Sequence, residues 1–312
     1  MREEKVFING KVALGTTITH VDDNTKSPAI VIIMGTGTLD RDGNGIGIKT
    51  NMYKNLAEEF AKLGFVSLRY DKRGTHKSGG KNLSTGLFDL VDDAVSVIKY
   101  AKTLSYIDEN KVIVCGHSEG GIIAALLSDR EETAGLMILG AAGCNLKDAL
   151  YYQNRLVSKE LSEMKGILGF LLRNQASEEK NIAKVDKLFD KCSSSDKDVI
   201  FFGGAKIQAK WIREHNSFSS DKMIEMLKAY KKPVLAITGT ADLSADYRCL
   251  EALENDSNIK TYAPEKVNHI LREIDNDNSM LKVKKQYMRL SKNPIHKETL
   301  GVISNWLHEN FG

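Results

Sequence analysis

The strongest constraint on the fold is an alternation of short apolar runs with longer amphipathic ones. Five runs rich in β-branched residues are typical of strands buried on both faces: Ala29–Gly35, Phe65–Asp71, Lys111–Gly116, Gly135–Ala141 and Pro233–Gly239. Helical spacing marks the segments Tyr53–Leu63, Phe88–Leu104, Gly120–Leu127, Tyr247–Leu253 and Leu300–Phe311. Lys11–His20 adds an early strand, antiparallel to its neighbour, and Asn258–Pro264 a last one. This order predicts an α/β fold with a mostly parallel central sheet flanked by helices.

The alternation stops between Asn145 and Ala229. This segment is rich in Lys and Glu, and it has apolar residues at helical spacing, for example Leu161, Met164, Leu168, Leu171 and Leu172. Within it only Asp198–Gly204 resembles a strand. We therefore expect a core in two parts, residues 1–144 and 231–312, separated by a helical lid insertion over residues 145–230.

Composition narrows the class of protein. The chain has 312 residues, of which 42% are hydrophobic, enough for a large buried core. Its 44 basic and 41 acidic side chains leave a net charge of +3, which favours neither a nucleic-acid nor a membrane partner. The start "MREEKVFING" lacks an apolar signal-peptide run, and no stretch approaches the roughly 18 apolar residues of a membrane helix. The four cysteines show no C-x-x-C pair. We expect a cytoplasmic protein, for which a homodimer is compatible with the sequence.

The stretch "VIVCGHSEGGIIAALL" joins a strand pattern directly to a helix pattern, with Ser118 at the turn between Gly116 and Gly120. A Gly-x-Ser-x-Gly pattern in this context is typical of a nucleophile elbow, in which the serine adopts a strained backbone conformation at the start of a helix. A simple strand-to-helix turn is the alternative. We expect Ser118 to be a catalytic nucleophile.

A serine needs a base to remove its proton and an acid to orient that base. In this arrangement the acid and the histidine follow the serine, each in a loop after a late strand. "AITGTADLSAD" supplies Asp242 in such a loop, and "YAPEKVNHILREI" supplies His269. Asp246 and Glu265 are alternatives for the acid, and we favour Asp242 because it directly follows the strand.

Acyl transfer also requires two N–H donors for the developing oxyanion. We expect the backbone N–H of Glu119, at the start of the helix, to be one donor. The other is predicted to be the N–H of Thr36 in the loop "MGTGTLDRDGNG". This loop matches neither G-x-G-x-x-G nor the Walker pattern, which argues against phosphate binding.

Together these segments resemble the α/β-hydrolase superfamily. "GTGTLDRDGNG" is similar to the Gly-Ser-Gly-Pro-x-Asp-Arg-Asp-Gly-Asn oxyanion loop of one group of bacterial serine esterases, and "RYDKRGTHKSGG" to a turn of the same group. "GHSEGG", "GTADLSAD" and "VNHILR" fit the elbow, acid loop and histidine loop, and "KWIREHNSF" resembles a lid segment. Three residues depart from the pattern: Met34 before the oxyanion glycine, Thr38 in place of proline, and His76 in place of glycine.

The residues and the resemblance imply a serine hydrolase that cleaves small to medium acyl or aryl esters through an acyl-enzyme, with no metal or organic cofactor. An acyltransferase or thioesterase would use the same residues, and a non-catalytic binding protein on this fold is a more distant alternative; a peptidase is disfavoured because no additional domain selects peptides. Four aromatic residues of the insertion are expected either to line the substrate pocket or to pack the lid: Trp211, Phe201, Phe202 and Phe218. Arg213 is expected at the solvent or beside an acidic substrate group.

Overall fold

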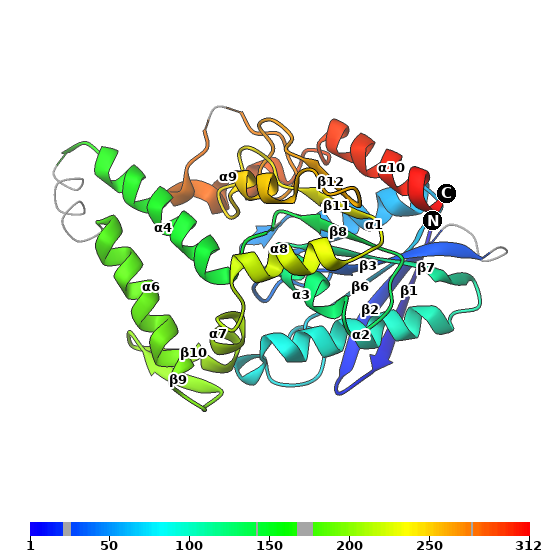
Figure 1. The fold of residues 1–312 in the computed structure, drawn as a ribbon, viewed down its shortest axis with the longest axis horizontal. Coiled ribbons are helices and arrows are strands. Elements are labelled where there is room, and N and C mark those ends of the chain that lie inside the picture. The colour runs from blue at the N-terminus through cyan, green and yellow to red at the C-terminus, as the bar shows by residue number, and fades with distance from the viewer. Residues whose placement is uncertain (21–25, 142, 167–176, 276) are drawn as a thin grey trace.

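The computed structural model describes residues 1–20, 26–141, 143–166, 177–275 and 277–312 (Figure 1). Its central sheet has eight strands: β1 (Arg2–Asn9), β2 (Ala13–His20), β3 (Ser27–Ile33), β6 (Val66–Tyr70), β7 (Ile107–His117), β8 (Gly135–Leu139), β11 (Val234–Ile237) and β12 (Ile259–Tyr262). They lie in the order β1-β2-β6-β3-β7-β8-β11-β12. β2 is antiparallel to β1 and β6, and every later pair is parallel. This is the α/β-hydrolase fold that the sequence predicts.

Strand β3 shows why the sheet strands are apolar along their whole length. Ala29, Val31 and Ile33 belong to one buried cluster, whereas Ile30 and Ile32 belong to another. Since successive side chains point to opposite faces of a strand, both faces of β3 are covered. The first cluster includes side chains of α2 (Leu87–Thr103), α3 (Glu119–Leu127) and α8 (Ser220–Ala229), and the second those of α1 (Met52–Lys62) and α10 (Lys297–Phe311).

The segment between β8 and β11 adds further helices and a hairpin: α4 (Leu146–Glu163), α6 (Glu178–Ser193), β9 (Val199–Phe202), β10 (Ala205–Gln208), α7 (Ala209–His215) and α8. In Figure 1 helices α4 and α6 lie side by side, at the end of the molecule opposite both termini. A separate small core, centred on Phe189, Cys192 and Ile212, packs α6 against α7. We call residues 145–230 the insertion.

Several elements differ from the sequence expectations. β1 was not expected, because its first four residues are all charged and most of the strand is exposed at the edge of the sheet. Tyr247–Leu253 forms a 3-10 helix, η2, in place of an α-helix. α9 (Val283–Leu290) was also missed. The residues Leu168, Leu171 and Leu172 lie outside the described ranges.

The remaining elements are short: β4 (Asn44–Gly45), β5 (Ile48–Lys49), η1 (Asn82–Ser84) and η3 (Met280–Lys282). Cys144 and Cys249, which no local motif pairs, form a disulfide between the start of the insertion and η2. Within the described ranges, no helix combines the length and apolar character needed to cross a membrane.

Candidate active site

Ser118 lies at the end of β7 and immediately before α3, in a strained backbone conformation with φ 54° and ψ −124°. The glycines beside it are required by close backbone contacts. A Cβ at Gly116 would lie 2.1 Å from the carbonyl oxygen of Gly120, and a Cβ at Gly120 would lie 2.1 Å from that of Ile33. Such a sharp turn exposes the serine hydroxyl at the carboxyl edge of the parallel strands.

Asp242 and His269 follow β11 and β12, which lie beyond β8 along the same edge of the sheet. His269 Nδ1 lies 2.7 Å from Asp242 Oδ2. The other carboxylate oxygen of Asp242 accepts the N–H groups of Ser244 and Ala245 at 2.7 and 3.0 Å. The carboxylate is buried, and its orientation is fixed by these three partners. An acceptor at Nδ1 leaves Nε2 of His269 free of the proton in the neutral ring, as a general base requires.

The alternative acids are engaged elsewhere. Asp246 accepts from the N–H of Arg248 at the start of η2 and pairs with its guanidinium at 2.6 Å. Glu265 is exposed. Of the acidic residues weighed from the sequence, only Asp242 contacts His269 in the part of the chain that is described.

The backbone N–H groups of Thr36 and Glu119 donate to no acceptor among the described residues. Thr36 follows Gly35, where a Cβ would approach that of Ser118 to 2.8 Å. The loop after β3 therefore passes against the turn at Ser118. Glu119 directly follows the serine, and Thr36 directly follows the glycine that packs against it. An oxyanion hole needs two such N–H donors without another acceptor.

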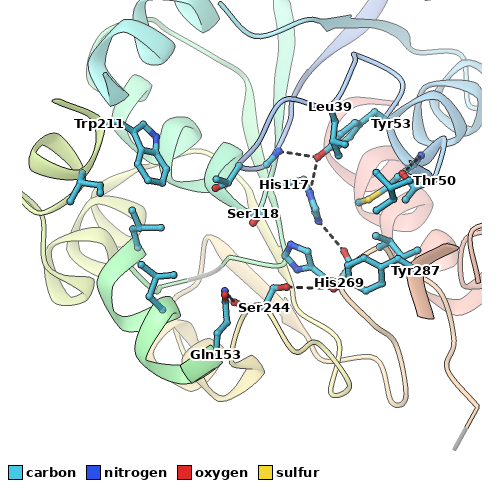
Figure 2. A pocket seen from close by; sticks show the side chains of 18 of the residues that line it. Leu39, Thr50, Tyr53, His117, Ser118, Gln153, Trp211, Ser244, His269 and Tyr287 are labelled. Carbon is cyan, nitrogen blue, oxygen red and sulfur yellow. Dashed lines mark hydrogen bonds between the residues drawn. The ribbon is translucent and has the colours of Figure 1, made fainter. Parts of the chain in front are cut away.

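Ser118, His269 and Thr36 share one cavity of about 410 Å³ (Figure 2). Its remaining walls come from the loop after β3, helix α1, the insertion and the segments after β11 and β12: Gly35, Leu39, Ile48, Thr50, Met52, Tyr53, His117, Leu146, Leu150, Gln153, Leu188, Trp211, Ile212, Ser244, Ile270 and Tyr287. No Asp, Glu, Lys or Arg occurs among these described lining residues. The volume and apolar walls suit a small organic ligand.

Residues 44–265, more than half of the chain, match the α/β-hydrolase family described as serine aminopeptidase, S33. The chain belongs to this family. It is 24% identical over 310 residues to the esterase EstD of Thermotoga maritima, covering 98% of this chain and 67% of that protein. Est1E of Butyrivibrio proteoclasticus, solved with ferulic acid, has a TM-score of 0.58 at 19% identity, covering 93% and 99% of the two chains. Esterase Pf2001 of Pyrococcus furiosus has a TM-score of 0.59 at 15% identity, covering 100% and 92%.

The side chain of Glu119 joins the elbow helix of this hydrolase to the insertion. It is buried, and its carboxylate accepts from Lys72 Nζ, Trp211 Nε1 and His215 Nε2. Burial by itself would raise the pKa of Glu119, but the Lys72 ammonium and the hydrogen bond from His215 lower the pKa well below its usual value. The carboxylate is therefore ionised, and it fixes Trp211 on the cavity wall.

The other aromatic residues expected in the pocket lie elsewhere, which corrects the sequence prediction. Phe218 packs against Phe88, with ring centroids 5.9 Å apart. Phe201 and Phe202 lie on β9, where Phe201 is 62% exposed. Only Trp211 of this set lines the cavity. The periodicity of a helix or hairpin shows which residues share a face. It does not show which distant segment that face packs against.

Two departures from the esterase pattern contact each other in the hydrolase. His76 Nε2 lies 2.8 Å from the carbonyl oxygen of Thr38. The same loop is held by Asp71, which accepts from the backbone N–H and the guanidinium of Arg41, both at 2.7 Å. The turn after β6 thus supports the loop that carries Thr36.

Arg213, which was expected either at the solvent or beside a substrate group, does not line the cavity. Its guanidinium donates to the carbonyl oxygens of Ser195 and Lys197. Met34 is buried in the core beside α1. Among the described residues there is no group of three or more His, Cys, Asp or Glu side chains arranged to hold a metal ion.

Proposed function

We propose that this hydrolase cleaves carboxylic esters with small to medium acyl or aryl groups, using Ser118, His269 and Asp242. The single observation that carries the proposal is the strained Ser118 beside the His269–Asp242 pair, in a cavity whose described lining has no Asp, Glu, Lys or Arg. Two N–H groups without an acceptor among the described residues lie close to this serine in the chain or in space. These are the parts needed for nucleophilic acyl transfer.

In this mechanism the oxygen of Ser118 bonds to the ester carbonyl carbon while its proton passes to Nε2 of His269. Asp242 holds the ring and stabilises its cation through the 2.7 Å contact at Nδ1. The N–H groups of Thr36 and Glu119 bind the oxyanion, each lowering the barrier by about 3 kcal/mol. The imidazolium then protonates the leaving alcohol, and water repeats the attack on the acyl-enzyme.

The cavity favours a neutral ester over the free amino terminus of a peptide. An aminopeptidase must bind an α-ammonium group, and burying that cation requires a nearby carboxylate. The described walls of the cavity provide none. In Figure 2 Trp211 and Gln153 lie on one side of Ser118, and Leu39 and Tyr53 on the other, which gives both parts of an ester a wall.

We further propose that the insertion is a lid over this site. Leu146, Leu150, Leu188, Trp211 and Ile212 of the insertion contribute to the cavity wall. These side chains would exclude water from the acyl group and set the size of substrate that fits.

The first test is hydrolysis of p-nitrophenyl acetate, butyrate and octanoate by the wild type and by Ser118→Ala. We expect turnover of the short esters and a loss of about 10⁴-fold or more in kcat for the variant. Methyl ferulate belongs in the panel because Est1E was solved with ferulic acid. Ser128→Ala, at the opposite end of α3, is the matched control and should keep wild-type rates.

Amino-acid p-nitroanilides test the aminopeptidase alternative in the same assay. Faster release from these anilides than from any ester would contradict the proposal. The proposal would also be contradicted if no ester in the panel were hydrolysed in a Ser118-dependent reaction. Thioesters and acyl acceptors would then be the next substrates.

A further inference from the structure

A chain of hydrogen bonds lies beneath the proposed catalytic residues and involves none of their reacting atoms (Figure 2). The N–H of Gly35 donates to Tyr53 Oη at 2.9 Å. Tyr53 Oη lies 3.0 Å from His117 Nδ1, and His117 Nε2 lies 2.9 Å from the carbonyl oxygen of His269. Tyr53 and His117 are each less than 5% exposed.

The three bonds have one consistent set of directions when His117 is neutral. The backbone N–H of Gly35 can only donate, so Tyr53 Oη accepts that proton. The carbonyl of His269 can only accept, so the single ring proton of a neutral His117 is on Nε2. Nδ1 is then an acceptor, and the hydroxyl hydrogen of Tyr53 is directed to it.

Burial supports the same protonation states. It lowers the pKa of His117 well below its usual value of 6.5, with a further contribution from the neighbouring His269. Burial also raises the pKa of Tyr53, so the hydroxyl keeps its proton. The three bonds are thus made by neutral groups in a closed part of the structure.

The hydrogen-bond chain reaches the backbone beside three of the proposed site residues, Thr36, Ser118 and His269. Gly35 directly precedes Thr36, His117 directly precedes Ser118, and the last bond ends on the backbone of His269. The rings of His117 and His269 also pack together, with centroids 4.5 Å apart. Since the N–H of Gly35 is taken by Tyr53, the next N–H along the loop, that of Thr36, is left for the substrate.

We propose that Tyr53 and His117 are positioning residues, which hold the oxyanion loop and the backbone of His269 in register with Ser118. This inference rests on the proposed function, because the loop and His269 matter only if Ser118 attacks a carbonyl group. The hydrogen bonds of both residues go to the backbone and to each other, and not to the reacting atoms. Their effect is on the geometry of the transition state, where small displacements are costly.

The decisive variant is Tyr53→Phe, which keeps the ring and removes the hydroxyl. With p-nitrophenyl butyrate we expect kcat to fall about 10- to 100-fold, because the Thr36 donor and His269 lose a common support. KM should change by less than about threefold, since the cavity walls remain. The inhibition constant of an alkyl boronic acid, which mimics the tetrahedral adduct, should rise in parallel with the loss in kcat.

Tyr230→Phe is the matched control. Tyr230 lies outside the cavity, and its hydroxyl bonds to the carbonyl oxygen and to Oγ1 of Thr133, both at 2.9 Å. It loses as many hydrogen bonds as Tyr53→Phe, so a similar fall in melting temperature is expected without a fall in kcat. This comparison separates positioning from general stability.

Conservative replacement of His117 gives a second readout. Glutamine offers one acceptor and one donor on a flat group, whereas leucine offers neither. His117→Gln should therefore retain at least about tenfold more of kcat than His117→Leu. Imidazole ¹⁵N spectra of the wild type, with His117 assigned by its loss in His117→Gln, should show a proton on Nε2 and none on Nδ1.

The two proposals fail in different ways. A wild type that hydrolyses no ester would refute the proposed function, and this inference with it. If the wild type is an active, Ser118-dependent esterase but Tyr53→Phe keeps its kcat, only the positioning role is overturned. A proton on Nδ1 of His117, or equal activity of the glutamine and leucine variants, would overturn it in the same way.

Discussion

At the scale of single residues, strain and close packing are concentrated at Ser118. The backbone of Ser118, with a φ of 54°, is strained by about 1–3 kcal/mol, and the surrounding contacts must offset this strain. The N–H of Ser118 donates to the carbonyl oxygen of Leu139 at 2.8 Å, and the glycines at 116 and 120 allow the chain to pass close to its neighbours. These contacts explain why the glycine pattern was informative about chemistry and not only about a turn.

Asp242→Asn tests the assignment of the acid. The amide that replaces the carboxylate cannot stabilise the His269 cation and favours the wrong tautomer, so we expect kcat for p-nitrophenyl butyrate to fall by about 10⁴-fold. Asp246→Asn removes only the contact to Arg248 and serves as the matched control. A larger loss in the Asp246 variant than in the Asp242 variant would reverse the assignment.

At the scale of elements, the contact between α3 and α7 depends on a buried charge. Glu119 on α3 is ionised and meets Lys72 from the turn after β6 together with Trp211 and His215 from α7. A buried ion pair adds little over a well-packed apolar pair, but removal of one partner leaves a charge without compensation. The insertion therefore contacts the core at a buried ion pair, where removal of one charged partner strongly lowers the free energy of unfolding.

Glu119→Gln should lower the free energy of unfolding by about 3–5 kcal/mol, because Lys72 stays buried without its counter-charge. Urea denaturation measures this change. The double variant Glu119→Gln/Lys72→Met should recover part of the loss, since it removes both charges. If the double variant were less stable than the single one, the unpaired charge of Lys72 would not be the cause of the loss. Glu132→Gln, at an exposed ion pair with Lys232, is the control.

At the scale of the whole molecule, local patterns predicted the sheet strands, the elbow and the order of the site residues. They did so because buried parallel strands are apolar throughout and because the site lies at their carboxyl ends. The edge strand β1 was missed since its polar residues face solvent. The support from Tyr53 was missed because that residue lies 64 positions before His117, and no periodicity reports such a contact.

The pairing of Cys144 with Cys249 was missed for the same reason, as the residues are separated by 105 positions. The bond connects the start of the insertion to the segment after the acid loop. Reduction, or Cys144→Ala/Cys249→Ala, should lower the free energy of unfolding by about 2–4 kcal/mol, because a long loop of the unfolded chain is released. Urea denaturation with and without dithiothreitol measures this. Dithiothreitol should not affect the double alanine variant; an equal effect on both proteins would contradict the assignment.

The backbone and the side chain of Glu119 have different proposed roles, and this limits how the insertion can be exchanged between relatives by evolution or by design. The main-chain N–H of Glu119 is a proposed oxyanion donor, while its side chain holds Trp211 and His215 of the insertion. An insertion transplanted from a relative must therefore bring a compatible residue into the serine motif itself, together with a partner for Lys72. Exchange of the insertion between relatives is therefore restricted by the residues at positions 72 and 119 of the core. Chimaeras that exchange both positions together with residues 145–230 should be more stable and more active than those that exchange the insertion alone.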